Sequence, residues 1–235
     1  MARWVVAGTV LVVVLAVVGA LVLGRSNRTI VDSGPVPSAT GPSPSASPAS
    51  PSPTDTAEPC PVGNPFSRQE YARDGRVHGG SLSFPRPTGW ADPGQQTREF
   101  TWAYDVGETD LPVQPQWFAT YAVGAVSVAD GFEDPQTAAE LAMRCTTSST
   151  LYQNVVSRTD VVSQETTVDG YPAWTLRAEI RADDPRTSFE GDTVQITVVD
   201  LDSPESLAFF WGCAPIGDQA LTAQLDEVAG QLRVG

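Results

Sequence analysis

The sequence contains no lysine and a single histidine, His78, so all 14 of its basic residues are arginines. Without lysine the chain cannot form a Ser-Lys catalytic dyad. One histidine, and three cysteines of which two would normally pair outside the cytoplasm, exclude a usual zinc site. Phosphate-binding loops and dinucleotide fingerprints are also missing. These absences remove several common enzyme classes, and we expect no metal or cofactor.

His78 lies in the segment RVHGGSLSF, next to Ser81 and Ser83. Residues so close in sequence seldom form a Ser-His-Asp triad, which is defined by its geometry in the fold. The stretch GGSLS also lacks the final glycine of the nucleophile-elbow pattern. We therefore interpret His78 as a turn or strand-end residue and not as a catalytic base.

Basic charge is scarce as well, because 28 Asp and Glu residues outweigh the arginines and give a net charge of −14. Phosphate backbones and anionic lipid headgroups would repel so acidic a chain. The composition therefore disfavours nucleic-acid binding.

Residues 4–23 form an apolar run without a charge, WVVAGTVLVVVLAVVGALVL. About twenty such residues suffice for a helix to cross the hydrocarbon layer, whereas the apolar core of a signal peptide spans only about 7–15. A cleaved signal peptide is the competing interpretation, and no cysteine follows that could carry a lipoprotein anchor. We predict a short cytoplasmic end at 1–3 and an uncleaved transmembrane helix at 4–24.

Residues 25–59 are dominated by Pro, Ser, Ala and Thr. A segment of this composition cannot bury enough apolar surface to fold, and frequent proline keeps it extended. We predict a disordered stalk that carries a single extracytoplasmic domain, 60–235, away from the cell membrane.

Within that domain, hydrophobic periodicity indicates strands and two helices. Asp134-Pro135 is typical of a helix start, and a second helix is expected after Asp218. Strands are expected at residues 81–84, 100–106, 117–123, 155–168, 171–180, 193–201 and 207–213.

The element order βββαββββα predicts an α+β fold, in which a largely antiparallel sheet of about six to seven strands packs with two main helices. Asp169-Gly170 predicts a tight hairpin. After it Trp174, Leu176, Ala178 and Ile180 alternate on one face, which we expect to pack against a helix.

Several motifs resemble those of a group of membrane-anchored extracytoplasmic actinobacterial proteins, mostly without assigned function. They are CP at 60–61, DGRVHGGSLSFPR at 74–86, DGFEDPQTAAEL at 130–141 and VDGYPAW at 168–174. The order of elements resembles the Mog1/PsbP-like fold. Members of that broad fold mostly act as binding or accessory modules, so the resemblance implies a similar role and carries over no catalytic residue.

The residues alone do not decide which two of Cys60, Cys145 and Cys213 pair. The resemblance implies a Cys60–Cys145 disulfide, with Cys213 left as a buried free thiol. In the chain-entropy model a loop of that length contributes on the order of 4 kcal/mol to stability. Apolar surroundings, LAFFWGC, would keep the Cys213 thiol unreactive.

Acidic clusters offer two weaker candidates. The loop RADDPRTSFEGD gathers Asp183, Asp184, Glu190 and Asp192, but it lacks EF-hand spacing and contains two arginines. We interpret it as a solvated loop and not as a calcium site. Asp200 and Asp202 could be paired carboxylates of a glycosidase, but no sugar cleft accompanies them in the sequence.

Five tryptophans follow the anchor. Trp102, Trp117, Trp174 and Trp211 occupy alternating strand positions and are assigned to the core. Trp90 lies in the loop PRPTGWADPGQQ, where it is either an exposed contact residue or an anchor that holds the loop down.

These observations predict a membrane-tethered, non-enzymatic binding or accessory module that contacts a protein or another cell-envelope component. A small-ligand or sugar-binding module is the alternative, and a hydrolase of unfamiliar type is the third. A deep pocket with convergent polar groups would favour the second or third interpretation. A flat apolar patch near Trp90 would favour the first. The sequence does not indicate the oligomeric state.

Overall fold

A computed structural model of the chain describes residues 59–92 and 99–235. The cytoplasmic end predicted at 1–3, the transmembrane helix predicted at 4–24 and all but the last residue of the stalk predicted at 25–59 lie outside this part. Among the described residues, no helix has the length and apolar character needed to span a membrane.

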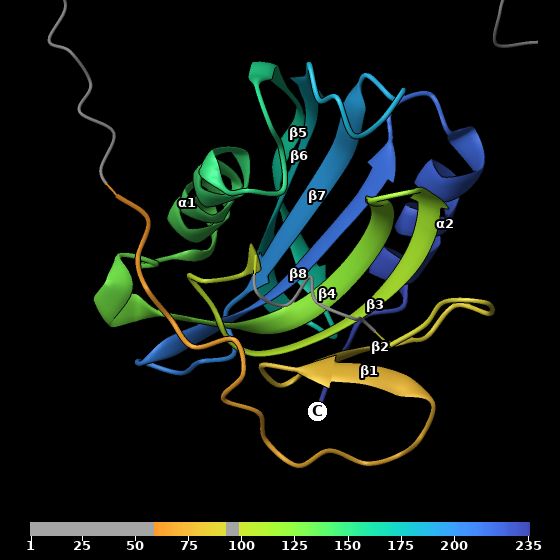
Figure 1. Ribbon diagram of the computed structural model, residues 1–235. Helices are drawn as coiled ribbons and strands as arrows, with labels where there is room; N and C mark the ends of the chain where they lie inside the picture. Colours follow the sequence, from red (N-terminus) through yellow and green to blue (C-terminus); the bar gives the residue numbers. More distant parts are fainter. Residues whose placement is uncertain (1–58, 93–98) are drawn as a thin grey trace, which may run out of the picture. The chain divides into compact units, whose positions relative to one another are not determined.

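The predicted α+β architecture is confirmed. Over the described residues the main sheet has six strands in the order β3-β4-β8-β7-β6-β5, and every neighbouring pair is antiparallel (Figure 1). The strands are β3 (Tyr104–Gln114), β4 (Trp117–Ser127), β5 (Val155–Val168), β6 (Tyr171–Ala182), β7 (Gly191–Val199) and β8 (Ser206–Pro215).

The β5–β6 hairpin turns at Asp169-Gly170, as predicted. Both turn residues have positive φ, 49° and 87°, and Val168 pairs directly with Tyr171. Two left-handed residues match the twist of a two-residue hairpin, which explains the Asp-Gly sequence.

The face of β6 that carries Leu176, Ala178 and Ile180 packs against a helix, as predicted, whereas Trp174 on the same face is only partly buried. The helix is α1 (Pro135–Ser148), and the three side chains are no more than 1% exposed. Asp134 caps α1, because its Oδ1 accepts hydrogen bonds from the backbone N–H of Gln136 and Thr137, both at 3.0 Å.

A second layer covers the opposite face of the main sheet. It consists of α2 (Gln219–Gly230) and a three-stranded sheet in the order β1-β2-β9 (Figure 1). The small strands are β1 (Arg76–Gly79), β2 (Leu82–Pro85) and β9 (Arg233–Val234). Only β2 and α2 were expected from the sequence. β1 runs directly into two glycines, which are typical of a turn, and β9 has only two residues.

The strand expected at 100–106 is corrected, since β3 begins only at Tyr104. Phe100 and Trp102 lie in the preceding turn, where their rings meet edge to face at 5.9 Å. Both are buried against Phe209 of β8. Their alternation therefore comes from packing of a turn onto the core and not from strand geometry.

Candidate functional site

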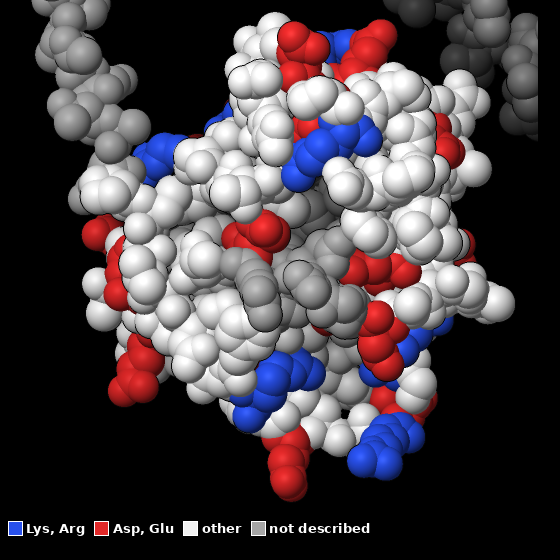
Figure 2. All heavy atoms as spheres, viewed as in Figure 1, with Lys and Arg blue, Asp and Glu red and all other residues white. Residues whose placement is uncertain are grey.

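On the α1 side of the main sheet, side chains of β4, β7 and β8 and of the loop after α1 enclose a cavity of about 170 Å³. We call it the Trp117 cavity. Its lining includes the side chains of Glu99, Phe100, Trp117, Thr150, Tyr152, Arg186, Asp192, Trp211 and Cys213. Figure 2 shows the surface of the domain, where acidic and basic side chains are interspersed.

The strand register brings the polar members of the cavity together. Asp192 is the second residue of β7, and Val194, two positions along, pairs with Cys213 of β8. Residues two apart on a strand point to the same face, so Asp192 and Cys213 both face the α1 side. Trp117 begins β4, on the other side of β8 in the sheet.

Asp192 is the buried polar centre of the cavity, with only 3% of its surface exposed. Its Oδ1 accepts a hydrogen bond from Trp117 Nε1 at 3.1 Å, and its Oδ2 accepts one from the Tyr152 hydroxyl at 2.9 Å. Burial raises the pKa of Asp192 to about 7, although these two hydrogen bonds act in the opposite direction. The carboxyl group is thus poised to change its charge near neutral pH.

The two other titratable groups inside the cavity stay protonated. Burial raises the pKa of Tyr152 well above its ordinary value, and the negative charge of Asp192 adds to the effect. The pKa of the Cys213 thiol is raised in the same way, for the same two reasons. Cys213 is a buried free cysteine, as the resemblance implied, and its Sγ donates to the carbonyl of Phe118 at 3.6 Å.

The rim of the cavity carries charges of both signs. The Arg186 guanidinium lies 5.9 Å from the centre of the Trp117 ring and forms an ion pair with Asp184. This arginine lowers the pKa of Asp184 to about 2. Glu99 accepts a hydrogen bond from the Thr150 hydroxyl at 2.5 Å. The arginine is therefore neutralised by its own partner, and Glu99 and Asp192 leave the lining net acidic.

The acidic loop does not assemble into a calcium site. Asp184 binds Arg186, Glu190 forms an ion pair with Arg181, and Asp192 points into the Trp117 cavity. Asp183 is exposed, and its backbone N–H and carbonyl bond to Asn154. Over residues 59–92 and 99–235, no three His, Cys, Asp or Glu side chains are grouped so that they could hold a metal ion.

Trp90 is not an exposed contact residue, and that interpretation is corrected. Its side chain is 6% exposed and stacks on Tyr121 with the ring centres 4.2 Å apart. The next residue, Ala91, forms a backbone bridge to Asp110 of β3. The bridge holds the loop against the sheet edge and turns the indole inward, so Trp90 anchors the loop.

The segment around His78 forms a separate polar cluster. His78 Nε2 lies 2.9 Å from Asp74 Oδ1, and the imidazole stacks on the Tyr71 ring. Ser83 Oγ accepts a hydrogen bond from Arg76 Nε at 3.0 Å, so its bonded partner is an arginine and not the histidine.

Asp200 and Asp202 lie in the loop after β7, where the Asp202 N–H donates to Asp200 Oδ1 at 2.9 Å. The hydrogen bond shapes a turn.

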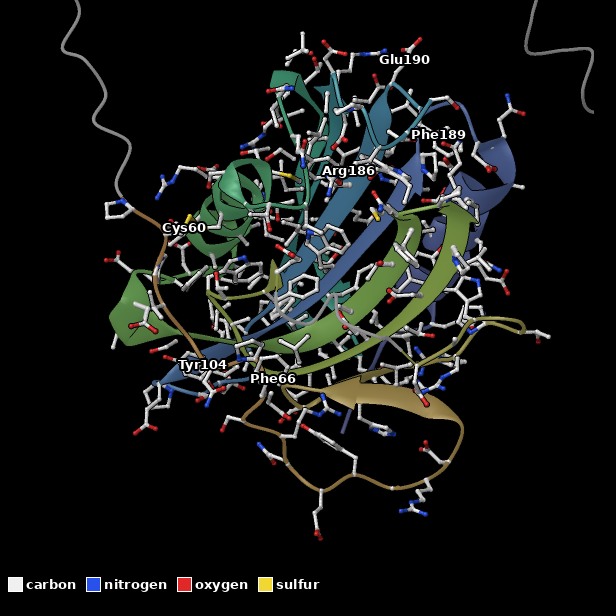
Figure 3. All side chains as sticks on the ribbon, viewed as in Figure 1. Cys60, Phe66, Tyr104, Arg186, Phe189 and Glu190 are labelled. Carbon is white, nitrogen blue, oxygen red and sulfur yellow. A yellow bond between two sulfur atoms is a disulfide. The ribbon has the colours of Figure 1, made fainter. Side chains whose placement is uncertain are left out.

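Cys60 and Cys145 form a disulfide, with their Cα atoms 5.6 Å apart. Figure 3 shows Cys60 beside α1, the helix that carries Cys145. The pairing implied by the resemblance is confirmed, and it attaches the beginning of the described chain to the first helix.

Sequence reasoning missed the Trp117 cavity although it had noted several of its residues. Asp192 was considered as a calcium ligand, while Trp117 and Trp211 were assigned to the core. The available signal was a carboxylate on the α1-facing side of the strand GDTVQITVV, where the other residues, Val194, Ile196 and Val198, are apolar.

No protein-family model matches the sequence, and no curated protein matches it either. Among solved structures, LpqN of Mycobacterium tuberculosis, which is involved in cell envelope biogenesis, is 13% identical. The match covers 65% of this chain and 82% of LpqN, with a TM-score of 0.43.

Two further solved structures are 12% identical to this chain. The Pseudomonas aeruginosa protein PA94, of unknown function, matches over 63% of this chain and 88% of its own, with a TM-score of 0.36. The cyanobacterial PsbP of Synechocystis matches over 66% and 87%, with a TM-score of 0.33. At these TM-scores the likenesses support no inference about function.

Proposed function

We propose that the domain is a non-enzymatic binding module that holds a small ligand in the Trp117 cavity. The observation that carries the proposal is the cavity itself, where aromatic walls converge on one buried carboxyl group. A pocket with convergent polar groups is the arrangement expected of a small-ligand module or a hydrolase, and not of a protein-contact surface at Trp90.

The size of the cavity suits a compact ligand. A cavity of roughly 150 Å³ in another protein accepts benzene, so about 170 Å³ accommodates a molecule of one ring or a similar branched group. Aromatic side chains on several sides supply apolar contact, and one polar group supplies orientation.

The state of the lining groups favours binding over catalysis. The Cys213 thiol is kept protonated by burial and is therefore a poor nucleophile. Asp192 is held in place by two neutral donors, Trp117 and Tyr152. These two hydrogen bonds hold the Asp192 carboxyl group in a position where it can recognise a ligand. Neither donor is a nucleophile that Asp192 could activate as a general base.

The Cys60–Cys145 disulfide supports a location outside the cytoplasm, because such bonds persist in oxidising compartments. We propose that the segment at 4–24 tethers the domain to the cell membrane. Contact with an envelope protein stays a prediction, and the buried Trp90 does not offer a surface for it.

The test blocks the mouth of the cavity. Thr150 is exposed at the rim, so Thr150→Trp would fill the opening without disturbing the core, and Thr150→Ala is the matched control that also loses the hydroxyl group. Phenol and 3,3-dimethyl-1-butanol serve as ring-sized probes. The indole N–H resonances of Trp117 and Trp211 report their binding by NMR.

We expect both probes to shift these resonances in the wild type and in Thr150→Ala, and to leave them unchanged in Thr150→Trp. Shifts that persist in Thr150→Trp would place the probes elsewhere. If the wild-type resonances do not move, the cavity is not a binding site.

A further inference from the structure

We propose that the ligand of the Trp117 cavity is a compact organic monocation, a protonated or quaternary amine. This inference rests on the proposed function and names the ligand class for the same cavity.

Several aromatic side chains line the cavity, among them Phe100, Trp117, Tyr152 and Trp211. The Trp117 and Tyr152 rings meet at 63° with their centres 5.9 Å apart. The Phe100 and Trp211 rings meet at 80° with their centres 5.3 Å apart. Aromatic faces carry negative charge density and attract cations, most strongly where water is excluded, and cages of this kind recognise quaternary ammonium groups.

Asp192 supplies the negative charge that such a cage would need. The two side chains that bond to it, Trp117 and Tyr152, are both neutral donors, so these hydrogen bonds do not balance the charge of an ionised carboxylate. A buried carboxylate without a cationic partner is costly, and a ligand cation would lower that cost.

The charged and titratable groups that face Asp192 are compatible with a cation. Cys213 of β8 and Tyr152 of the loop after α1 remain neutral because burial raises their pKa values. Arg186, the one positively charged side chain of the lining among the described residues, lies 5.9 Å from the centre of the Trp117 ring, and Asp184 balances its charge in an ion pair. Glu99 adds a second negative charge at the rim.

The charges of the lining would disfavour an anionic ligand. It would enter a space lined by Asp192 and Glu99, and Arg186 is already engaged by Asp184 and by the carbonyl of Leu151 at 2.8 Å. The net charge of the whole chain, −14, also favours the approach of cations.

The test compares choline with 3,3-dimethyl-1-butanol, which has the same shape but no charge. Titration calorimetry is performed at pH above the pKa of Asp192 on the full-length protein in a maltoside detergent, whose headgroup contains no amine. The matched variant is Asp192→Asn, in which the amide oxygen can still accept from Trp117 and the amide N–H can donate to Tyr152.

We expect choline to bind the wild type at least about tenfold more tightly than the neutral analogue, in line with a desolvated cation–π interaction. Asp192→Asn should remove most of this preference, lowering the affinity for choline far more than the affinity for the neutral analogue. If Asp192→Asn does not fold, Tyr152→Phe replaces it and should likewise weaken choline binding more than binding of the neutral analogue, because the carboxylate loses a donor that holds it in place.

Proton release provides an independent measurement on the wild type. Choline binding near pH 7 should release a proton from Asp192, seen as a difference in heat between buffers of different ionisation enthalpy. Equal affinity for both probes without proton release would overturn the cation proposal and leave the proposed small-ligand function intact. Failure of both probes to bind would overturn both proposals.

Discussion

Asp192 shows how a single residue can give a small domain a chemically distinctive interior. A carboxyl group is expensive to bury, and this one is held by two donors and not by an arginine. The nearby Arg186 is directed to Asp184 instead. The cavity therefore keeps a group that can be either neutral or negative near physiological pH.

The raised pKa of Asp192 predicts a pH-dependent stability. Its folded pKa, about 7, exceeds the ordinary value near ~4, so its contribution to the free energy of unfolding is complete below ~4 and is lost as the pH rises through about 7. The side chain of Asp192→Asn cannot ionise, so the variant does not lose this free energy of unfolding as the pH rises. Between about pH 4 and about pH 7, chemical denaturation should show the variant gaining stability relative to the wild type, by up to ~1.4 kcal/mol per pH unit.

Comparing the wild type with Asp192→Asn cancels the contributions of the other titratable groups to the pH dependence of stability. Burial also raises the pKa of Asp110, to about 6, but Asp110 is present in both proteins. A stability difference that stays constant over this pH range would show that the pKa of Asp192 is not raised.

Residue-level properties of this kind were only partly predictable. The sequence indicated that Cys213 would be buried, because its neighbours are apolar. It could not indicate that Trp117, Tyr152 and Asp192 meet, since they are separated by 35 to 75 positions and are brought together by strand order. The sequence also left open whether Trp90 is exposed or anchors its loop, because the answer depends on a bridge from Ala91 to a distant strand, which turns the indole inward.

At the scale of elements, α1 is defined by its first residues. Asp134 accepts two backbone N–H bonds and one from the Thr137 hydroxyl at 2.7 Å, and Pro135 occupies the first helical position. The sequence predicted this start because capping chemistry is local. The strand β9 escaped prediction because it has two residues and its partner β2 is distant in the sequence, whereas β1 escaped because its glycine-rich end is typical of a turn.

Removal of this cap should have a measurable effect. Asp134→Ala leaves backbone N–H groups at the start of α1 without their side-chain acceptor and should lower the free energy of unfolding by about 1 kcal/mol. Asp134→Asn is the control, because asparagine caps helices about as well. Equal stability of both variants in urea denaturation would contradict the capping role.

At the scale of the molecule, the small sheet lies directly on the backbone of the main sheet. Gly80, at the end of β1, has φ 55°, and a Cβ atom there would lie 2.0 Å from the Gly124 carbonyl carbon of β4. The two layers are thus held at a separation that admits no side chain at this point.

Gly80→Ala should therefore lower the free energy of unfolding far more than the same substitution at a turn glycine that has open space around it. Gly75→Ala is the matched control, since Gly75 also has positive φ, 80°, but a Cβ atom there would meet no other atom within 4 Å. The control should lose only the ~1–2 kcal/mol of a left-handed alanine, whereas Gly80→Ala should lose on the order of 3 kcal/mol or more. Similar melting temperatures for the two variants would show that the layers can separate without cost.

The layered arrangement was the part of the whole molecule that the sequence predicted best. Alternating apolar positions and two amphipathic helices require a sheet with helices packed on it. The second sheet was not predicted. The motif DGRVHGGSLSFPR forms the β1–β2 hairpin, which packs on β3 and β4, and the motif alone does not indicate that packing.

The Cys60–Cys145 bond has a mechanical consequence. A pulling force applied to the chain before Cys60 and to the C-terminus passes through the two sulfur atoms into α1, and the intervening polypeptide bears no load. The oxidised domain should therefore extend less under tension than its reduced form, by up to ~3.4 Å for each of the residues between the two cysteines. In a tethered protein, the cavity side chains Glu99, Phe100 and Trp117, which lie inside this loop, would be shielded from tension on the tether.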